Sequence, residues 1–196
     1  MPNSVYNEPH IIWMAIITLF QFAQKYAAAL KAYGNVYKDD GAQNAYIDVA
    51  QEALWRQLMS EMSKIYDHES TCGSDNCSIR QLSRCCLNHA TAMHGKSSEL
   101  TAQLDALCER YESLLSKELR NKKLAHYDLA AVFLQEPPPI AFDDVEQFIN
   151  DTAHTLQQVG DCLLGVKVNF GYDELVKKYQ ASLLKLAIGD ESHDQL

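Results

Sequence analysis

The sequence predicts an all-α protein, an antiparallel bundle of about six helices in a single domain over residues 1–196. Three observations favour this fold class. A chain of 196 residues suffices for one compact domain with a real core. The hydrophobic fraction of 47% is close to that of an ordinary globular chain. Only 8 Gly and 5 Pro leave few signals for turns between strands, which favours helices.

Apolar residues and chain breakers set the expected order of the helices. In the second and fourth helices, apolar side chains recur at spacings of three and four residues. Gly34 and the polar stretch KDDGAQ (38–43) should end the first helix, and the chain should turn near Gly95. We expect a frayed tail over 189–196. The predicted helices cover about residues 9–33, 45–66, a short helix from 78, 98–127, 143–164 and 172–188.

Two helix starts carry a capping-box pattern, in which a polar residue precedes Gln or Glu by three positions. Ser78 with Gln81 opens the third helix. Asp143 with Glu146 opens the fifth, directly after QEPPPIAF (135–142). The three consecutive prolines in that stretch are the strongest breaker in the chain.

Charge and hydropathy exclude several classes of protein. The net charge of −9 means that the surface as a whole repels nucleic acids and acidic membranes, so binding of an anion requires a local basic patch. The N-terminus lacks the basic segment of a secretory signal. The apolar run IIWMAIITLF (11–20) is well short of the roughly 20 residues that cross a bilayer. We therefore expect a cytoplasmic, soluble protein with no membrane partner.

The six cysteines have irregular spacing and include the adjacent pair Cys85-Cys86, which is not typical of a disulfide framework. Reduced core thiols are expected for most of them. A zinc site is an alternative for the loop DHESTCGSDNC (67–77), which offers His68, Cys72 and Cys77. A fourth ligand would have to come from outside the loop, and the four residues between the two cysteines are a loose spacing for structural zinc. We expect no metal and no cofactor. The candidates for that fourth ligand are Cys85, Cys86 and His89.

Positive charge concentrates near the end of the fourth predicted helix, in LRNKKLAHYD (119–128). Residues 110–127 hold five basic and two acidic side chains, a local charge of +3, which leaves −12 on the rest of the chain. Cations at the C-terminal end of a helix are stabilised by about 0.3–1 kcal/mol each, so a solvated helix end would also account for the pattern. Residues 117–126 are called the basic segment below.

Arg120 and His126 are the residues of the basic segment whose chemistry suits catalysis. Histidine titrates near neutrality and moves protons in either direction. The planar guanidinium of arginine fits phosphate oxygens. Together they can cleave a phosphodiester without a metal, because one imidazole moves the protons while arginine stabilises charge on the phosphorane.

Helix geometry limits how these two residues meet. On a regular helix Arg120 and His126 lie roughly 120° apart around the axis and about 9 Å apart along it. One straight helix does not bring them together, and one protomer offers only one such histidine. A two-fold dimer would pair two of each residue in one interface. One interface of a homodimer could then hold both an acid and a base in a composite site.

These residues resemble a known family. Arg120-Asn121, four further residues and His126 are similar to the Arg-polar…His signature of the HEPN superfamily. LRNKKLAHYD resembles the form found in its abortive-infection, AbiU-like branch. WRQLMSEMSKIYD (55–67) followed by SIRQL (78–82) is similar to the segment that this branch carries before its basic helix. The resemblance covers roughly residues 45–130.

The resemblance implies a HEPN-like bundle of four or five helices that dimerises along the motif helix. It also implies a metal-independent endoribonuclease that leaves 2′,3′-cyclic phosphate and 5′-hydroxyl ends, acting as a toxin or phage-defence effector. RNA would be the substrate, and an antitoxin or regulatory protein a possible partner. A non-catalytic HEPN module that binds a nucleotide or a partner protein stays open as the alternative.

The resemblance also assigns roles to single residues. Arg120 would bind phosphate, His126 would act as acid and base, and Asn121 would orient the pair or bind ribose. Asp67, which closes the upstream helix, would hold Arg120 or His126. Two further assignments rest on the residues themselves. Lys122 and Lys123 would steer the RNA backbone by charge. Tyr127 directly follows the histidine. In some HEPN toxins a tyrosine stands one position later and can be modified, but the spacing differs here, so Tyr127 is expected to be a supporting residue in the core or the interface.

Overall fold

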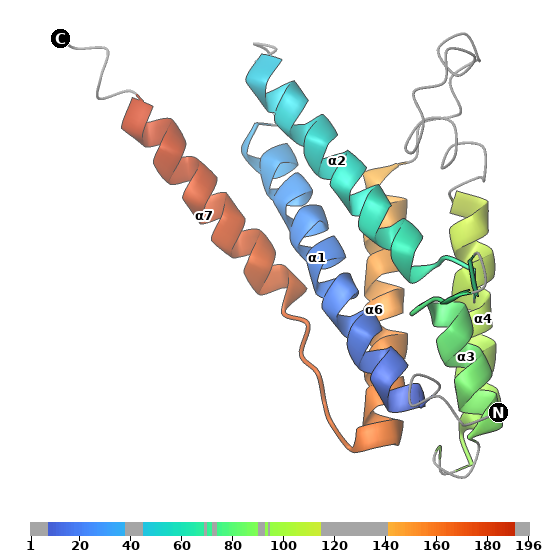
Figure 1. Cartoon of the computed structure of the whole chain (residues 1–196). Helices are drawn as coiled ribbons and strands as arrows, with labels where there is room; N and C mark the ends of the chain where they lie inside the picture. Colours follow the sequence, from blue (N-terminus) through green and yellow to red (C-terminus); the bar gives the residue numbers. More distant parts are fainter. Residues whose placement is uncertain are drawn as a thin grey trace, which may run out of the picture. The chain divides into compact units, whose positions relative to one another are not determined.

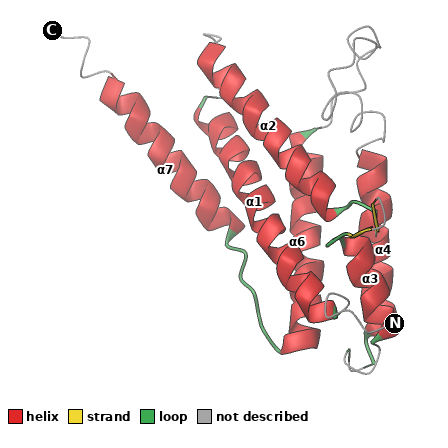
Figure 2. Cartoon of the chain, viewed as in Figure 1, coloured by secondary structure: helices red, strands yellow, loops and turns green. Residues whose placement is uncertain are grey.

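The computed structural model describes residues 8–37, 45–68, 70–71, 74–89, 93, 95–114 and 141–190. This part of the chain is all-α, as predicted, and contains six helices (Figure 1). Loops join the helices, and one short pair of strands lies between α2 and α3 (Figure 2). The helices are α1 (Pro9–Val36), α2 (Ala45–Ile65), α3 (Ile79–Asn88), α4 (Ser97–Leu114), α6 (Phe142–Leu164) and α7 (Tyr172–Asp190).

The helix starts follow local chemistry. Ser78 is the N-cap of α3, and its side chain accepts a hydrogen bond from the backbone N–H of Gln81, as the capping-box pattern predicts. The prediction that Asp143 caps α6 is wrong. The N-cap is Ala141, which makes no side-chain cap bond, and Asp143 lies within the first turn. An acidic residue there interacts favourably with the positive end of the helix dipole.

One helix end differs from the predictions. Gly34 does not end α1, which continues to Val36. The predicted continuation of the fourth helix from Leu114 to Tyr127 lies outside the described residues, as does 191–196 of the predicted tail. Gly165 ends α6 in the left-handed conformation with φ of +62°, and its N–H donates to the Asp161 carbonyl. Glycine adopts this conformation without a steric penalty.

The loop between α2 and α3 contains a short antiparallel pairing. Strand β1 (Ser70–Thr71) pairs with β2 (Ser74–Asp75), with Ser70 opposite Asp75 and Thr71 opposite Ser74. The loop prediction for this stretch did not include it, because two-residue strands leave no periodic pattern to detect.

The chain forms two compact units. The first is built from Met1–Phe20 and Ser60–Asn169, and the second from Gln21–Met59 and Phe170–Leu196. The long helices α1 and α2 each contribute residues to both units. The prediction of one domain over the whole chain stays a prediction.

In the first unit, α4 packs against both α3 and α6 (Figure 1). Of the five apolar residues whose spacing predicted α4, Leu114 is only partly buried. The other four are buried at helical spacing: Leu100, Leu104, Leu107 and Tyr111. The beginning of α1 supplies further core side chains. The largest buried side chains of this unit are Trp13, Tyr66, Tyr111, Phe20 and Phe148.

The second unit holds the rest of α1, the start of α2, and α7. Helix α7 is amphipathic, since Tyr172, Val176 and Leu183 are buried while Leu184 and Leu186 are exposed. Met59 at the end of this unit's α2 segment is buried.

By length and composition, α1 is the one helix of the described residues that could cross a membrane. The predicted ten-residue apolar run is part of this longer helix. Half of the relevant apolar window is buried inside the structure.

Candidate functional site

Most of the predicted site residues fall in one stretch, 115–140, that lies outside the described residues. These are Arg120, Asn121, Lys122, Lys123, His126 and Tyr127. Asp67 is described, and so is the last part of α4, which leads into the basic segment. Within the described residues, the candidate site is therefore represented by Asp67 and the end of α4.

Asp67 holds the two ends of the loop between α2 and α3. Its Oδ1 accepts a hydrogen bond from the backbone N–H of His68 at 2.8 Å, and its Oδ2 accepts one from Nδ2 of Asn76 at 3.3 Å. The same amide of Asn76 donates to the His68 carbonyl at 2.8 Å. Each carboxylate oxygen has two lone pairs, so these bonds leave capacity for a further donor.

The zinc alternative gains no support from the described residues, among which no group of three or more His, Cys, Asp or Glu could hold a metal ion. Cys72 lies outside them. Cys77 is exposed, whereas Cys85 and Cys86 are buried. The five cysteines of the described residues form no disulfide: Cys77, Cys85, Cys86, Cys108 and Cys162.

Two buried thiols have strongly raised pKa values. Burial raises the pKa of Cys86 from 9.0 to about 12, with smaller contributions from nearby Cys85 and Cys162. Burial likewise raises the pKa of Cys108 to about 12, against a lowering effect of Arg80. Both thiols are therefore protonated at neutral pH, which is the opposite of what a nucleophilic cysteine needs.

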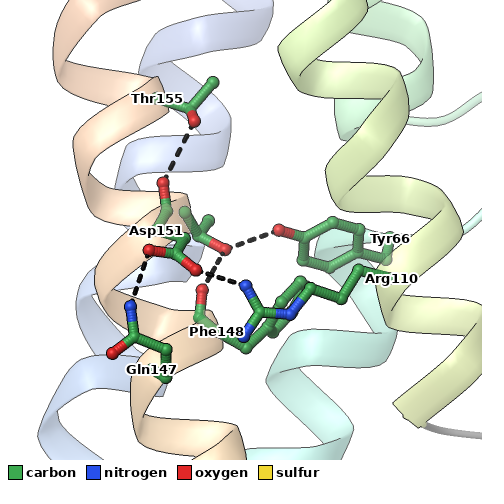
Figure 3. Close-up of polar contacts among 7 residues, drawn as sticks. Tyr66, Arg110, Gln147, Phe148, Asp151 and Thr155 are labelled. Atoms are coloured by element: carbon green, nitrogen blue, oxygen red, sulfur yellow. Dashed lines mark hydrogen bonds and ion pairs between the residues drawn. The ribbon is translucent and has the colours of Figure 1, made fainter.

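A polar cluster joins the end of α4 to α6 (Figure 3). Arg110 on α4 forms an ion pair with Oδ2 of Asp151 on α6, and both side chains are a little under 40% exposed, at 39% and 38%. The second carboxylate oxygen of Asp151 accepts a hydrogen bond from Nε2 of Gln147 at 2.9 Å. The guanidinium also lies over the Phe148 ring, 5.5 Å from its centroid. Arg110, Gln147, Phe148 and Asp151 are called the Arg110 cluster below.

Aromatic side chains pack next to the Arg110 cluster. The rings of Tyr66 and Tyr111 stack with centroids 4.6 Å apart, and Tyr66 lies 5.2 Å from Phe148. The Tyr111 hydroxyl hydrogen-bonds to Ser63 at 2.9 Å. The last part of α4 is therefore attached through neighbouring residues in two directions, by Arg110 to α6 and by Tyr111 to α2.

Tyr66 also makes a buried hydrogen bond to Thr152 at 2.7 Å. The Thr152 hydroxyl donates its single proton to the Phe148 carbonyl at 2.8 Å, so the tyrosine is the donor to the threonine oxygen. Burial raises the pKa of Tyr66 well above its ordinary value, and the hydrogen bond to Thr152 opposes this shift. Tyr66 is thus a neutral structural residue next to Asp67.

Sequence reasoning counted Arg110 as part of the positive charge but did not find its partners. Gln147 and Asp151 are four residues apart, which indicates one helix face. Nothing in that spacing identifies a partner 41 residues away on α4, because the pairing depends on how the two helices are rotated against each other.

A family model, HEPN_AbiU2 (AbiU2), matches residues 14–186, which include the basic segment and the Arg110 cluster. Comparison with curated proteins and with solved structures gave no match. The family match covers most of the chain and agrees with the resemblance of LRNKKLAHYD and of the upstream segment. The chain therefore belongs to the AbiU2 family, in the abortive-infection branch of the HEPN superfamily.

Proposed function

We propose that this protein is a metal-independent endoribonuclease with a composite Arg/His site at a homodimer interface. The observation that carries the proposal is the presence of Arg120, Asn121 and His126 in HEPN spacing within the matched residues 14–186. The residue types supply the chemistry: a permanently charged fork for phosphate and a group that moves protons near neutral pH.

The proposed reaction uses one histidine from each protomer. His126 of one protomer accepts the proton of the ribose 2′-hydroxyl while that oxygen attacks phosphorus. Protonated His126 of the partner subunit donates a proton to the 5′-oxygen as its bond to phosphorus breaks. The products are a 2′,3′-cyclic phosphate and a 5′-hydroxyl. Because one imidazole must be neutral and the other protonated, the rate should fall on both sides of an optimum pH.

Other residues of the basic segment have supporting roles in this proposal. Arg120 stabilises the charge that develops on the phosphorane. Asn121 orients the reacting groups, and Lys122 and Lys123 contact the RNA backbone. The acidic remainder of the chain, at −12, repels RNA elsewhere and so favours binding at this patch.

Two residues support the site from outside this set. Asp67, which has lone pairs not used by the loop contacts, holds Arg120 or His126. Tyr127 is a supporting residue of the core or the interface. Membership in the AbiU2 family supports a role as a cytoplasmic toxin or phage-defence effector, with an antitoxin or regulatory protein as its partner.

The test is cleavage of a mixed RNA substrate in EDTA, with analysis of the product ends. We expect cyclic-phosphate ends from the wild type and none from His126→Ala. The matched control is His154→Ala, because His154 is an exposed histidine on α6 whose ring hydrogen-bonds to the side-chain amide of Gln158. That control should cleave like the wild type.

Two results would contradict the proposal. Cleavage retained in His126→Ala would remove the assigned acid and base. Binding of RNA or nucleotide by both proteins, without product from either, would favour the non-catalytic HEPN module instead.

A further inference from the structure

Aromatic side chains line one face of α1 within the second unit. Phe22 and Tyr26 are four residues apart, and Tyr33 follows seven residues later, so the three lie on one side of the helix. Tyr37 extends this face, because its N–H donates to the Tyr33 carbonyl at 3.0 Å and continues the helical turn. The four residues span about 22 Å along the helix axis. Phe22, Tyr26, Tyr33 and Tyr37 are called the aromatic stripe below.

The aromatic stripe lies on the outer side of α1. The opposite side holds small side chains that are fully buried, among them Ala27 and Ala28. Phe22 is 46% exposed, and the three tyrosines are partly buried. The rings of Tyr33 and Tyr37 contact each other, with centroids 5.9 Å apart. Rings that neighbouring groups already hold lose little freedom when a ligand stacks on them.

The charge of α1 favours an anionic ligand. The helix carries Lys25 and Lys31 and no acidic residue, in a chain whose net charge is −9. Lys25 borders the aromatic stripe, with its Nζ 5.1 Å from the centroid of the Phe22 ring. Lys31, nine residues after Phe22, points to the other side of the helix. An ammonium group beside aromatic rings suits a nucleic-acid single strand, whose phosphates are bound by charge and whose bases stack on rings.

The size of the aromatic stripe favours RNA over a second copy of the chain. Stable protein interfaces bury about 800 Å² on each partner, from roughly 20–30 residues. Four rings, three of them already partly buried, do not supply such an area. Stacking needs little area, and each base that stacks on an aromatic side chain strengthens binding about fivefold or more. Bases within a duplex are already stacked and paired, so the ligand has to be single-stranded.

We propose that the aromatic stripe and Lys25 bind a single-stranded segment of RNA. Unpaired bases stack on the rings, and a backbone phosphate lies near the Lys25 ammonium. This inference rests on the proposed function, because RNA is the substrate there, and it adds a surface that binds this substrate. The residues of the stripe take no part in the cleavage step.

The test measures RNA affinity by fluorescence anisotropy. The ligand is a labelled, unstructured RNA of mixed sequence, and every protein carries His126→Ala to prevent cleavage. Adding Tyr26→Ala/Tyr33→Ala should raise Kd about tenfold or more. The matched control Tyr26→Phe/Tyr33→Phe keeps both rings and should change Kd less than about twofold. A fully base-paired RNA should bind all three proteins alike.

Two single variants extend the test. If thermal unfolding shows that the double alanine variant is not folded, Phe22→Ala replaces it, because Phe22 is nearly half exposed, and Kd should rise about fivefold. Lys25→Ala should weaken binding and reduce the slope of log affinity against log salt by about 0.7. Its matched control is Lys96→Ala, which removes an exposed lysine of the first unit and should keep the slope.

Three results would overturn the inference. The first is an unchanged Kd in the folded alanine variants, and the second is an equal loss of affinity for base-paired RNA. The third is lost self-association in sedimentation velocity with unchanged RNA affinity, which would assign the stripe to contact between copies of the chain. Cleavage by the wild type beside any of these results leaves the proposed function intact. Conversely, a wild type that cuts nothing but binds RNA through the stripe would support this surface and overturn the proposed nuclease.

Discussion

The indole nitrogen of Trp13 donates a hydrogen bond of 2.7 Å to the carbonyl oxygen of Leu156, across 143 residues of sequence. The indole is 2% exposed. It lies against Gly160, one helical turn after Leu156, where an added Cβ would stand 2.3 Å from Cζ2 of the tryptophan. The absence of a side chain at position 160 therefore makes room for the indole on the surface of α6.

Gly160→Ala should destabilise the protein. The methyl group would overlap three atoms of a buried ring, which has to shift together with its hydrogen bond. Overpacking of this kind costs about 1–3 kcal/mol in the free energy of unfolding. Urea denaturation of the two proteins measures the difference.

The matched control is Gly34→Ala, also within a helix, where the added Cβ would have no atom within 4 Å. Alanine has the higher helix propensity, so this variant should gain about 0.5–1 kcal/mol. The same loss in both variants would show that helical glycines, and not the indole, determine the effect.

Tyr66→Phe should cost about 0.5–1.5 kcal/mol of unfolding free energy, the net value of one hydrogen bond. The phenylalanine keeps the ring stack with Tyr111, and Thr152 keeps its own bond to the Phe148 carbonyl. Chemical denaturation measures the change.

Thr152→Val should cost more, about 1–3 kcal/mol, because it leaves the buried Tyr66 hydroxyl without its acceptor. Adding Tyr66→Phe to this variant should recover part of the loss, since no polar group then lacks a partner. Additive effects in the double variant would contradict the hydrogen bond between the two residues.

Stability should fall at alkaline pH. The pKa values of Cys86 and Cys108 are about 12 in the folded protein, against 9.0 for the ordinary thiol. Above pH 9 the unfolded chain releases these protons while the folded protein keeps them, so the unfolded state gains. The stabilisation is complete below pH 9 and is lost as the pH rises toward 12. The loss is at most about 1.4 kcal/mol per pH unit for each thiol.

Urea denaturation under reducing conditions, at pH 8 and at steps up to about pH 10.5, measures this dependence. The double variant Cys86→Ala/Cys108→Ala will have a lower stability at pH 8, because two core side chains are truncated. Its stability should nevertheless fall less steeply with pH. Parallel curves would show that other groups, such as buried Tyr66, cause the alkaline loss.

Asp67→Ala and Asn76→Ala should both loosen the loop between α2 and α3, since each removes contacts that join its two ends. Limited proteolysis should therefore cut residues 68–77 faster in both variants. Asp67→Ala alone should also lower RNA cleavage, because the carboxylate is proposed to hold Arg120 or His126. Equal cleavage by the two variants would restrict Asp67 to the loop.

The sequence was sufficient to predict the helices where periodic apolar residues coincide with a local signal at the boundary. Ser78 and Gln81 mark the start of α3, and the predicted start of α4 differs from the observed one by a single residue, Ser97. The starting point of α6 was misjudged because acidic residues are favourable both at the N-cap and in the first turn. Gly34 was misjudged because a glycine near the end of a helix can either terminate the helix or be accommodated within its last turn.

Contacts between distant segments could not be predicted from the sequence. The pairs Trp13–Gly160 and Arg110–Asp151 depend on the rotation and packing of whole helices, which local patterns do not encode. For the candidate site, in contrast, the sequence identifies residues that the structure does not describe. The motif identifies Arg120 and His126 directly, and their assignment stays a prediction because both residues lie outside the described part of the chain.

The two tryptophans of this chain fall one in each compact unit: Trp13 belongs to the first and Trp55 to the second. Each unit therefore carries its own fluorescent reporter. Trp55→Phe leaves a protein whose emission follows the packing of the indole against α6, and Trp13→Phe leaves one whose emission follows the other unit. Coincident denaturation curves from these two variants would mean that both units unfold in one cooperative transition. Separated curves would mean that the two units unfold independently.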